Sequence, residues 1–593
     1  MKLGPITTAT LAVVVTASSV AIPAVTIRAQ VPPADPLIRA MHDEIERSLK
    51  LTVPNLEKPY FIEYLLDDSE AFNVSANLGG LTGRRREKIR SLDVRVRVGD
   101  YKFDNTNYTG SDFNFGTHYD LERFPLEDSY PVLRRYFWLA TDTAYKSAVE
   151  AIARKRAALR NLNVSDQLND FAHAEPVHVL RNLQKLSVDE DAWANRVRKL
   201  SAVFDRYPDV EGSTVEFRVG DGGYYLVNSE GTVVRVPDRT ASLRARADAR
   251  APDGMRVRDA VVIQTTDAAG MPADAELTRS VDSLAQRVTA LAHARKGDDY
   301  AGPVLFEGTA AAQVFAQVLG RNLAITRRPV MDPRRNTPVE TSELDGRLGA
   351  RILPDTFDVW DDPLLTEWGG KPLFGTFEVD REGVAPQKLH LIENGTLKGY
   401  LLTRQPVRGA EGSNGHARMP GSFGASTASI SNLFVSSTAT VPLPELRRKL
   451  MDLVAMRGKP YGIVVREMDF PSSMSIEDAR RMLAGVPSGG SFPVSLPILV
   501  YRVYPDGHEE LVRGMQFRGF NTRSLKDILA VGDDLTRFDY LENPAPFALM
   551  GAASYEANTT VVAPSILIDD LELRPLEEET QRLPVVPAPE LVK

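Results

Sequence analysis

The chain has 593 residues, of which 43% are hydrophobic and 25% are charged, so it can form two to four domains and wholesale disorder is excluded. Its net charge of −8 comes from interspersed acidic and basic residues, which argues against a nucleic-acid-binding protein, since that needs a basic face. Cysteine is absent, and this excludes disulfides, a thiol nucleophile and any thiolate metal ligand.

Residues 1–29 have the features of a secretion signal. Lys2 precedes an apolar run around residues 11–15, and small residues suited to cleavage follow, up to Ala29. We therefore predict export to the periplasm or the extracellular space. An uncleaved membrane anchor is the alternative, and Pro23 weakens it. No later segment approaches the roughly 20 continuous apolar residues of a spanning helix.

Residues 30–270 are predicted to form an N-terminal α/β layered domain. Asp35 before Pro36 marks a helix start, and apolar residues then recur at helical spacing as far as Leu49. Further helices are predicted over 143–162 and 191–204, and strands over 59–66, 91–100, 213–220, 224–236 and 241–250. A turn at 228–231 predicts a hairpin, and GDGG at 220–223 is interpreted as another hairpin turn.

The second half, residues 271–575, is predicted to be a β-rich domain. It opens with an amphipathic helix over 275–296, and we place the domain boundary directly before that helix. Strands are predicted over 373–380, 388–402, 429–435, 461–469, 497–504, 510–520 and 566–573, with a strong turn at Asn394-Gly395 and one helix over 444–458. Residues 576–593 form a Pro- and Glu-rich tail that we expect to be loose.

An ordered set of segments carries a family resemblance. In chain order they are NSEGTVVRV, ADARAPDGM, GPVLFEGTAAAQVFAQVLGRNL, EVDREGVAPQKLHLIENGTLKGYLLTR, SNGHARMPGS, ISNLFV and VVAPSILIDDLEL. Together they resemble the TldD/PmbA family, also called modulator of DNA gyrase, from about residue 210 to 573, and residues 36–205 are compatible with it. The resemblance implies an α+β protein whose C-terminal domain is β-rich and barrel-like.

The family resemblance also implies a metallopeptidase helix with the motif H-E-x-x-x-H. Its two histidines and a distant cysteine hold zinc, and its glutamate activates the bound water. Histidines five residues apart are separated by about 140° on an ideal α-helix, so this helix must distort or end near the second one. In this chain the three motif positions carry Ala316, Gln317 and Arg321, while Gly320 remains where the distortion is needed. No cofactor is therefore expected, and a simple core helix that never held metal is the alternative.

Other candidate sites have weaker support. His173 and His178 are close in sequence, but Pro176 breaks any helix that would align them. The pairs Asp361-Asp362 and Asp569-Asp570 lack calcium-loop spacing and are interpreted as solvated surface. The sequence has no G-x-S-x-G elbow, no P-loop and no dinucleotide fingerprint.

The resemblance places the loop with His416 near the substrate cleft. It makes His416, Arg418 and Asn432 the candidates for contacts with substrate. A polar loop contact is expected for His416 rather than metal coordination.

Three functions remain open at this point. The first is a non-catalytic subunit that forms a homo- or heterodimer with a zinc-bearing TldD-like paralogue and supports proteolysis of unfolded or short peptides. The second is an active exported peptidase with an unidentified metal or hydrolytic site. The third is a stand-alone binding or scaffold protein.

Overall fold

The computed structural model describes most of the chain between Asp35 and Leu576. The described residues are 35–109, 124–160, 168–331, 341–421, 424–470, 494–542 and 556–576. The predicted signal and, apart from Leu576, the predicted tail lie outside these ranges, so export stays a prediction. Within these ranges, no helix has both the length and the apolar character that crossing a membrane requires.

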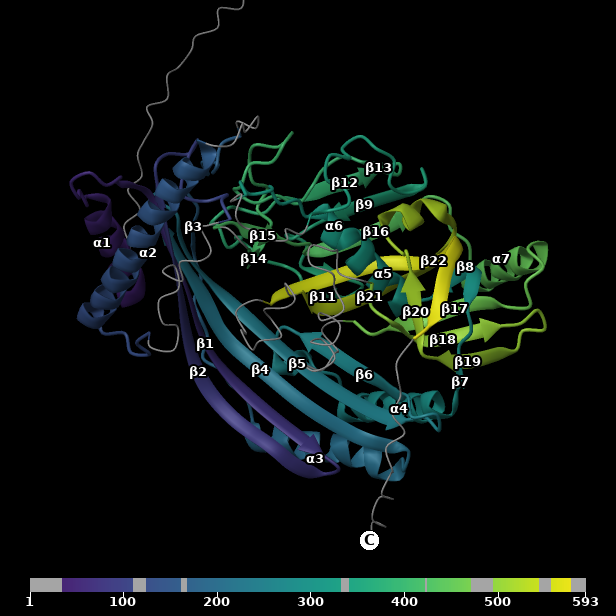
Figure 1. Cartoon of the computed structure of the whole chain (residues 1–593). Helices are drawn as coiled ribbons and strands as arrows, with labels where there is room; N and C mark the ends of the chain where they lie inside the picture. Colours follow the sequence, from purple (N-terminus) through teal and green to yellow (C-terminus); the bar gives the residue numbers. More distant parts are fainter. Residues whose placement is uncertain are drawn as a thin grey trace, which may run out of the picture.

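The first half of the chain builds a strongly curved sheet of long strands (Figure 1). Its order is β2-β1-β4-β5-β3, with β6 paired to β5. The strands are β1 (Pro59–Asn77), β2 (Gly80–Val98), β3 (His178–Leu180), β4 (Val210–Asn228), β5 (Val233–Arg250) and β6 (Arg256–Thr265). All pairs are antiparallel except that of β3 with β5. The predicted hairpin turn at 228–231 is confirmed between β4 and β5.

β1 and β2 are longer than predicted. They are joined by Leu78 and Gly79, whose φ angles of 46° and 77° are both positive. Two such residues form the tight turn whose twist matches that of the flanking strands. The unpredicted part of β2 is mostly polar and solvent-exposed, so it lacks the apolar alternation that marks a strand with one buried face.

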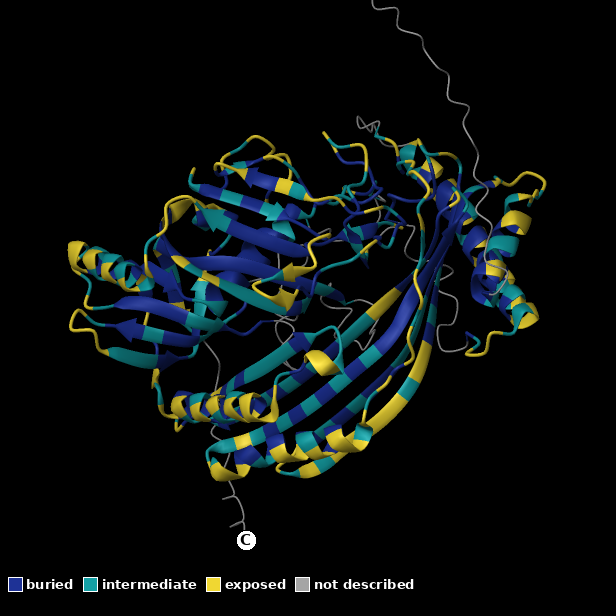
Figure 2. Ribbon diagram, turned by 180° about the vertical axis from the view of Figure 1, so that it is seen from behind, coloured by how far each residue is buried: buried dark blue, intermediate teal, exposed yellow. Residues whose placement is uncertain are grey.

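Helices cover the convex face of this sheet (Figures 1 and 2). They are α1 (Pro36–Leu49), α2 (Tyr130–Leu159), α3 (Glu190–Ser201) and α4 (Asp274–His293). α1 and α2 pack over one end of the strands, and α3 and α4 over the other. Figure 2 shows buried residues alternating with more exposed ones along the long strands. The predicted start of α1 is confirmed, because the Asp35 carboxylate accepts the backbone N–H groups of Leu37 and Ile38.

The segment GDGG is not a hairpin turn but the middle of β4, so that prediction was wrong. A Cβ on Gly222 would lie 2.3 Å from the carbonyl oxygen of Asp68 in β1. A Cβ on Gly223 would lie 2.5 Å from the carbonyl oxygen of Val236 in β5. Neighbouring backbones approach too closely here for side chains, and glycine is what permits this approach.

Helix α4 covers the convex face of the first sheet and also contacts the second half of the chain. Its apolar stripe shares a core with residues of β1, β4 and β5, such as Phe72 and Phe217, and that core also includes Leu499 of the second half. The predicted stripe along α4 is confirmed by the burial of Leu277, Val281, Leu284, Val288 and Leu291. Because the helix contacts both sheets, the predicted domain limits, 30–270 and 271–575, stay a prediction.

The second half builds a larger sheet in the order β13-β12-β9-β16-β22-β8-β17-β18-β19-β7, with β20 and β21 also paired to β22. Its central strands are β22 (Ala557–Pro575), β8 (Tyr300–Phe306), β17 (Gly462–Met468) and β16 (Asn432–Ser437). The others are β7 (Arg295–Lys296), β9 (Phe357–Asp361), β12 (Leu389–Glu393), β13 (Thr396–Leu397), β18 (Pro497–Val503), β19 (Glu509–Arg513), β20 (Met515–Arg518) and β21 (Ile528–Glu542). The predicted helix over 444–458 is α7 (Leu443–Met456). The protein is therefore a mixed α+β protein, with this sheet on the concave side of the first (Figure 1).

One strand prediction in the second half was wrong. Residues 373–380 form no strand, and their backbone N–H groups donate to side chains and to nearby loop carbonyls instead of to a neighbouring strand. The N–H of Phe374 donates to Thr560 Oγ1 at 3.1 Å, and that of Gly375 donates to Asn432 Oδ1 at 3.0 Å. The predicted turn at Asn394 and Gly395 is confirmed by φ angles of 47° and 71°.

Candidate functional site

The helix that carries the three motif positions is distorted. It follows β8 as α5 (Thr309–Val314), continues as a π-helical turn, η5 (Phe315–Gly320), and ends as α6 (Arg321–Leu323). The N–H of Arg321 donates to the carbonyl of Ala316, a bond that spans five residues. A π-bulge brings residues five apart toward one face, and such bulges are frequent at functional sites. The distortion expected from the motif spacing is therefore observed.

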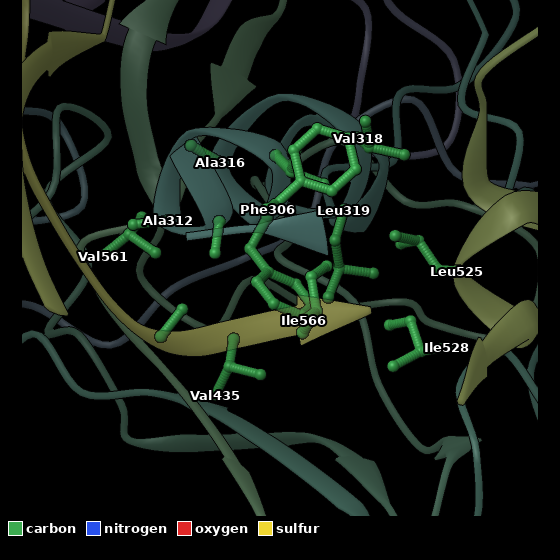
Figure 3. Close-up of a cluster of buried hydrophobic side chains, with 14 of the residues drawn as sticks. Phe306, Ala312, Ala316, Val318, Leu319, Val435, Leu525, Ile528, Val561 and Ile566 are labelled. Atoms are coloured by element: carbon green, nitrogen blue, oxygen red, sulfur yellow. The ribbon is translucent and has the colours of Figure 1, made fainter. Parts of the chain in front are cut away.

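Apolar packing holds this helix in place. Val314, Phe315 and Leu319 are 0% exposed, and Val318 is 3% exposed. Figure 3 shows the helix above Phe306 of β8 and Ile566 of β22, and Ala316 belongs to the same buried apolar cluster. A Cβ on Gly320 would lie 2.8 Å from Ile430 Cδ1, so a side chain at this position would require the end of the Ile430 side chain to shift. Apolar packing on several sides therefore helps to fix the shape of this helix.

Ala316 and Gln317 stand where the resemblance places the first histidine and the glutamate. Ala316 is 1% exposed and has no donor atom in its side chain. Gln317 is 7% exposed, and its Oε1 accepts the N–H of Ser495 at 2.9 Å. Within the described residues, its Nε2 has no hydrogen-bond partner. An amide is not a base at neutral pH, so Gln317 cannot take a proton from water as a carboxylate does.

Arg321 stands where the second histidine would be. Its Nη2 lies 3.7 Å from Glu542 Oε1, and Tyr540 Oη donates to Glu542 Oε2 at 2.9 Å. Burial, followed by the Glu542 carboxylate, raises the pKa of Tyr540 well above its usual value, so this phenol is neutral. A guanidinium is permanently charged and cannot coordinate a cation. The three motif positions therefore do not fit a zinc ion.

His416 is fully buried in a polar network. Its Nε2 lies 3.1 Å from Asp361 Oδ2, and its Nδ1 lies 3.0 Å from the Asn414 carbonyl. Asp361 Oδ1 also accepts the N–H of Ser431 at 2.9 Å. Both ring nitrogens are engaged, so the ring joins the His416 loop to the end of β9.

Asn432 is also fully buried, and it organises the segment between β9 and β12. Its Nδ2 donates to the carbonyl of Asp362 at 3.0 Å, and its Oδ1 accepts the N–H of Gly375. For His416 and Asn432 alike, the bonds made in the structure hold loops together. Their proposed contact with substrate stays a prediction.

Arg418 is the partly exposed member of the three substrate-cleft candidates. Its Nη1 and Nη2 donate to the carbonyls of Ile430 and Asn558, each at 2.7 Å, and its guanidinium lies 4.7 Å from the centre of the Phe377 ring. Burial lowers the pKa of this guanidinium to about 10. Ile430 also contacts Gly320, so Arg418 lies beside the end of the π-helical turn.

Among the described residues, the other sequence candidates are not grouped as metal ligands. In the ranges that the structure describes, no three His, Asp or Glu side chains are grouped so as to hold a metal ion. His173 has a side chain that is 60% exposed, and His178 lies exposed on β3. The interpretation of Asp361 and Asp362 as solvated surface was wrong, since they are 0% and 8% exposed and bind His416 and the following loop.

A cavity between the two sheets was not foreseen from the sequence. It has a volume of about 270 Å³ and is lined by charged residues of β5, β6 and the end of β17. Burial, and then the neighbouring Asp259, raise the pKa of Glu467 in this cavity to about 8. Its lining residues come from strands that are far apart in the sequence, so no local pattern could reveal it.

Comparisons with known proteins agree with this architecture. Residues 300–574 match the model of the PmbA/TldA metallopeptidase C-terminal domain. A segment of 78 residues is 36% identical to a metalloprotease of Archaeoglobus fulgidus, and it spans 13% of this chain and only 17% of that relative.

Solved structures share the fold over nearly their whole length. TldE from Thermococcus kodakarensis has a TM-score of 0.54 at 14% identity, covering 90% of this chain and 99% of that one. A modulator of DNA gyrase from Thermotoga maritima has a TM-score of 0.52 at 15% identity, covering 86% of this chain and 96% of that one. Residues 300–574 therefore match the C-terminal domain of the PmbA/TldA metallopeptidases, and the chain as a whole shares the fold of these solved structures.

Proposed function

We propose that this chain is a non-catalytic subunit that works beside a zinc-bearing paralogue in the breakdown of unfolded or short peptides. The paralogue would supply the H-E-x-x-x-H helix and the cysteine. This chain would supply part of the wall of the peptide-binding space. The sequence of its N-terminus favours an exported location for this assembly.

The contact between Arg321 and Glu542 is the observation that carries the proposal. A zinc site needs three protein donors such as imidazole or thiolate, and a catalytic site also needs an open position for water. Here the second histidine position holds a cation near a buried carboxylate, 3.7 Å away. The first position offers only a methyl group, and the full sequence has no cysteine. The whole donor set has been replaced, while the packing of the helix is kept.

The open strand order of the second sheet supports a role in binding peptides. β7 stands at one end of that order as an edge strand, whereas the outer side of β13 at the other end is already bonded to residues 349–351. An extended peptide can add to such an edge through main-chain hydrogen bonds, and its side chains then determine specificity. Peptide binding needs no metal, so this property survives the loss of the zinc ligands.

Co-expression with a family member that keeps H-E-x-x-x-H tests the proposal. We expect the two chains to purify together, and the complex, but not this chain alone, to hydrolyse an unfolded peptide. Hydrolysis by the isolated chain would favour the active peptidase instead. Failure to bind any such relative, together with peptide binding by the isolated chain, would favour a stand-alone binding protein.

The variant Gln317→Ala should leave the turnover of the complex within about twofold of the unchanged protein, because an amide does no acid-base work. Gln313→Ala, on the same helix, is the matched control, since Gln313 also uses its Oε1 to accept a backbone N–H, that of Met468. Steady-state peptide hydrolysis and thermal melting would be measured for both variants. A loss of turnover of about 100-fold in Gln317→Ala alone, with an unchanged melting temperature, would show that Gln317 takes part in catalysis.

A further inference from the structure

Arg418 differs from the buried arginines of this protein in having no acidic partner. Five arginines in the described residues are classed as buried, and each pairs with a carboxylate within 2.9 Å. The pairs are Arg90 with Asp68, Arg97 with Asp104, Arg404 with Glu230, Arg502 with Asp298 and Arg513 with Asp253. The contacts of Arg418, in contrast, are two carbonyls and one aromatic ring.

This arrangement leaves a cation with little compensation. Burial lowers the pKa of Arg418 to about 10, whereas partners raise the pKa of Arg90, Arg97 and Arg502. A desolvated charge without a counterion is unfavourable, and an arriving anion would relieve that cost.

The nearest acids are already engaged or stand further away. Asp361 binds His416 and Ser431, and Glu542 accepts the Tyr540 hydroxyl. Asp361, Tyr540, Asp238 and Glu542 each act to raise the pKa of Arg418 through their charge, but no described carboxylate forms an ion pair with it. The side chain therefore keeps unused N–H donors on its partly exposed surface.

The guanidinium is also held in a fixed orientation. Carbonyls from two separate segments, Ile430 before β16 and Asn558 in β22, each bind one terminal nitrogen. The ring of Phe377 lies against the guanidinium. A planar fork that is already ordered loses little entropy when it binds a carboxylate with two parallel hydrogen bonds.

Because Ile430 touches both Arg418 and Gly320, the fork lies next to the end of the distorted helix. We propose that Arg418 binds a carboxylate of a peptide ligand, either its C-terminal carboxylate or the side chain of an Asp or Glu residue. This inference rests on the proposed function, which makes a peptide the ligand. It gives this subunit a selective role, favouring peptides that present a carboxylate at that point.

Fluorescence anisotropy with three labelled peptides of otherwise identical neutral sequence tests this proposal on the full chain. One peptide has a free C-terminus, the second has a C-terminal amide, and the third has the amide and one internal Glu. We expect a carboxylate peptide to bind about tenfold more tightly than the neutral amide. The first peptide binds more tightly if Arg418 binds a C-terminal carboxylate, and the third binds more tightly if Arg418 binds an acidic side chain.

The variants Arg418→Met and Arg418→Lys separate binding from folding. In Arg418→Met the preference for the carboxylate peptide should fall to within about twofold, while Arg418→Lys should keep part of it as a point charge. Thermal melting of each variant reports the structural cost of losing the two carbonyl contacts. Should Arg418→Met not fold, competition by acetate on the unchanged protein shows whether a carboxylate is recognised, and Arg418→Lys shows whether the residue at 418 recognises it.

Two results would overturn the inference in different ways. If all three peptides bind the unchanged protein equally, Arg418 is a structural tie between Ile430 and Asn558, and the proposed function still stands. If none of them binds, this inference is refuted, and peptide hydrolysis by the complex with the paralogue decides the proposed function separately.

Discussion

The variant Asp170→Ala should lose about 3–5 kcal/mol of unfolding free energy, the cost typical of removing one partner of a buried ion pair. Asp170 is 3% exposed and Lys155 is 2% exposed, and Asp170 Oδ2 lies 2.5 Å from Lys155 Nζ. The pair joins α2 to the segment that precedes β3. The carboxylate also accepts the N–H of Asp104 at 2.8 Å and lies 3.5 Å from Arg327 Nη1.

The large effect follows from what the variant leaves behind. Lys155 also donates to the carbonyls of Asp104 and Thr106, at 3.0 and 2.7 Å. These dipoles do not replace a full negative charge, and burial already lowers the pKa of Lys155 and raises that of Asp170. Without Asp170 the Lys155 ammonium is buried without its closest counterion. Either Lys155 must lose its proton or the folded state must lose stability.

Urea denaturation of Asp170→Ala and of a matched surface variant would measure this effect. On the same helix, Lys146 pairs with Asp142 at 2.6 Å, but the two side chains are 71% and 42% exposed. Asp142→Ala should therefore change the unfolding free energy by less than about 1 kcal/mol. The double variant Lys155→Met/Asp170→Leu should recover part of the loss, because it removes both charges. A change below about 1 kcal/mol in Asp170→Ala would contradict the assignment of this pair as a buried ion pair.

The variant Glu467→Gln should be more stable than the unchanged protein above pH 8 and should show a flatter dependence of stability on pH. Burial, then Asp259, raise the pKa of Glu467 from 4.5 to about 8. Arg287 acts in the opposite direction, and Gln313 Nε2 lies 3.4 Å from Glu467 Oε1. Between these two values the unfolded chain has lost the proton while the folded chain keeps it. The unfolded state therefore binds fewer protons, and stability falls as the pH rises through this range.

Each pKa unit corresponds to about 1.4 kcal/mol, and partial exposure of the carboxyl reduces the total to roughly 2–4 kcal/mol. The amide introduced by Glu467→Gln would keep an oxygen as an acceptor for Gln313 and carries no charge at any pH. Thermal melting from pH 5 to pH 9 would compare this variant with Glu411→Gln, a change at an exposed loop position. Parallel curves for Glu467→Gln and the unchanged protein would refute the raised pKa.

The sequence predicted those elements whose buried face is apolar. The stripe on α4, the strands of the second sheet from β16 to β19, and the Asn394-Gly395 turn follow directly from periodicity and turn chemistry. The outer half of β2 was not predicted as a strand because its residues are polar on both faces. GDGG was predicted as a turn, although it lies in a strand, because the sequence does not distinguish glycine that permits close strand packing from glycine that permits a turn.

The candidate site was predictable only in part. The motif spacing led to the expected distortion, which the bond from Arg321 to Ala316 shows. The pairing of Arg321 with Glu542 joins residues far apart in the chain, and no local pattern reveals it. Likewise, the sequence could not distinguish a buried His416 bound to Asp361 from a histidine that faces a ligand.

Elemental analysis of the purified full-length chain tests the central claim most directly, which is that this chain carries no catalytic metal site of its own. The protein would be prepared without chelators or an affinity tag that binds metal, then dialysed and measured for zinc and other transition metals. The account predicts a content far below one ion per chain and no peptide hydrolysis by the isolated chain. One tightly held ion per chain, together with hydrolysis that a chelator abolishes, would contradict it.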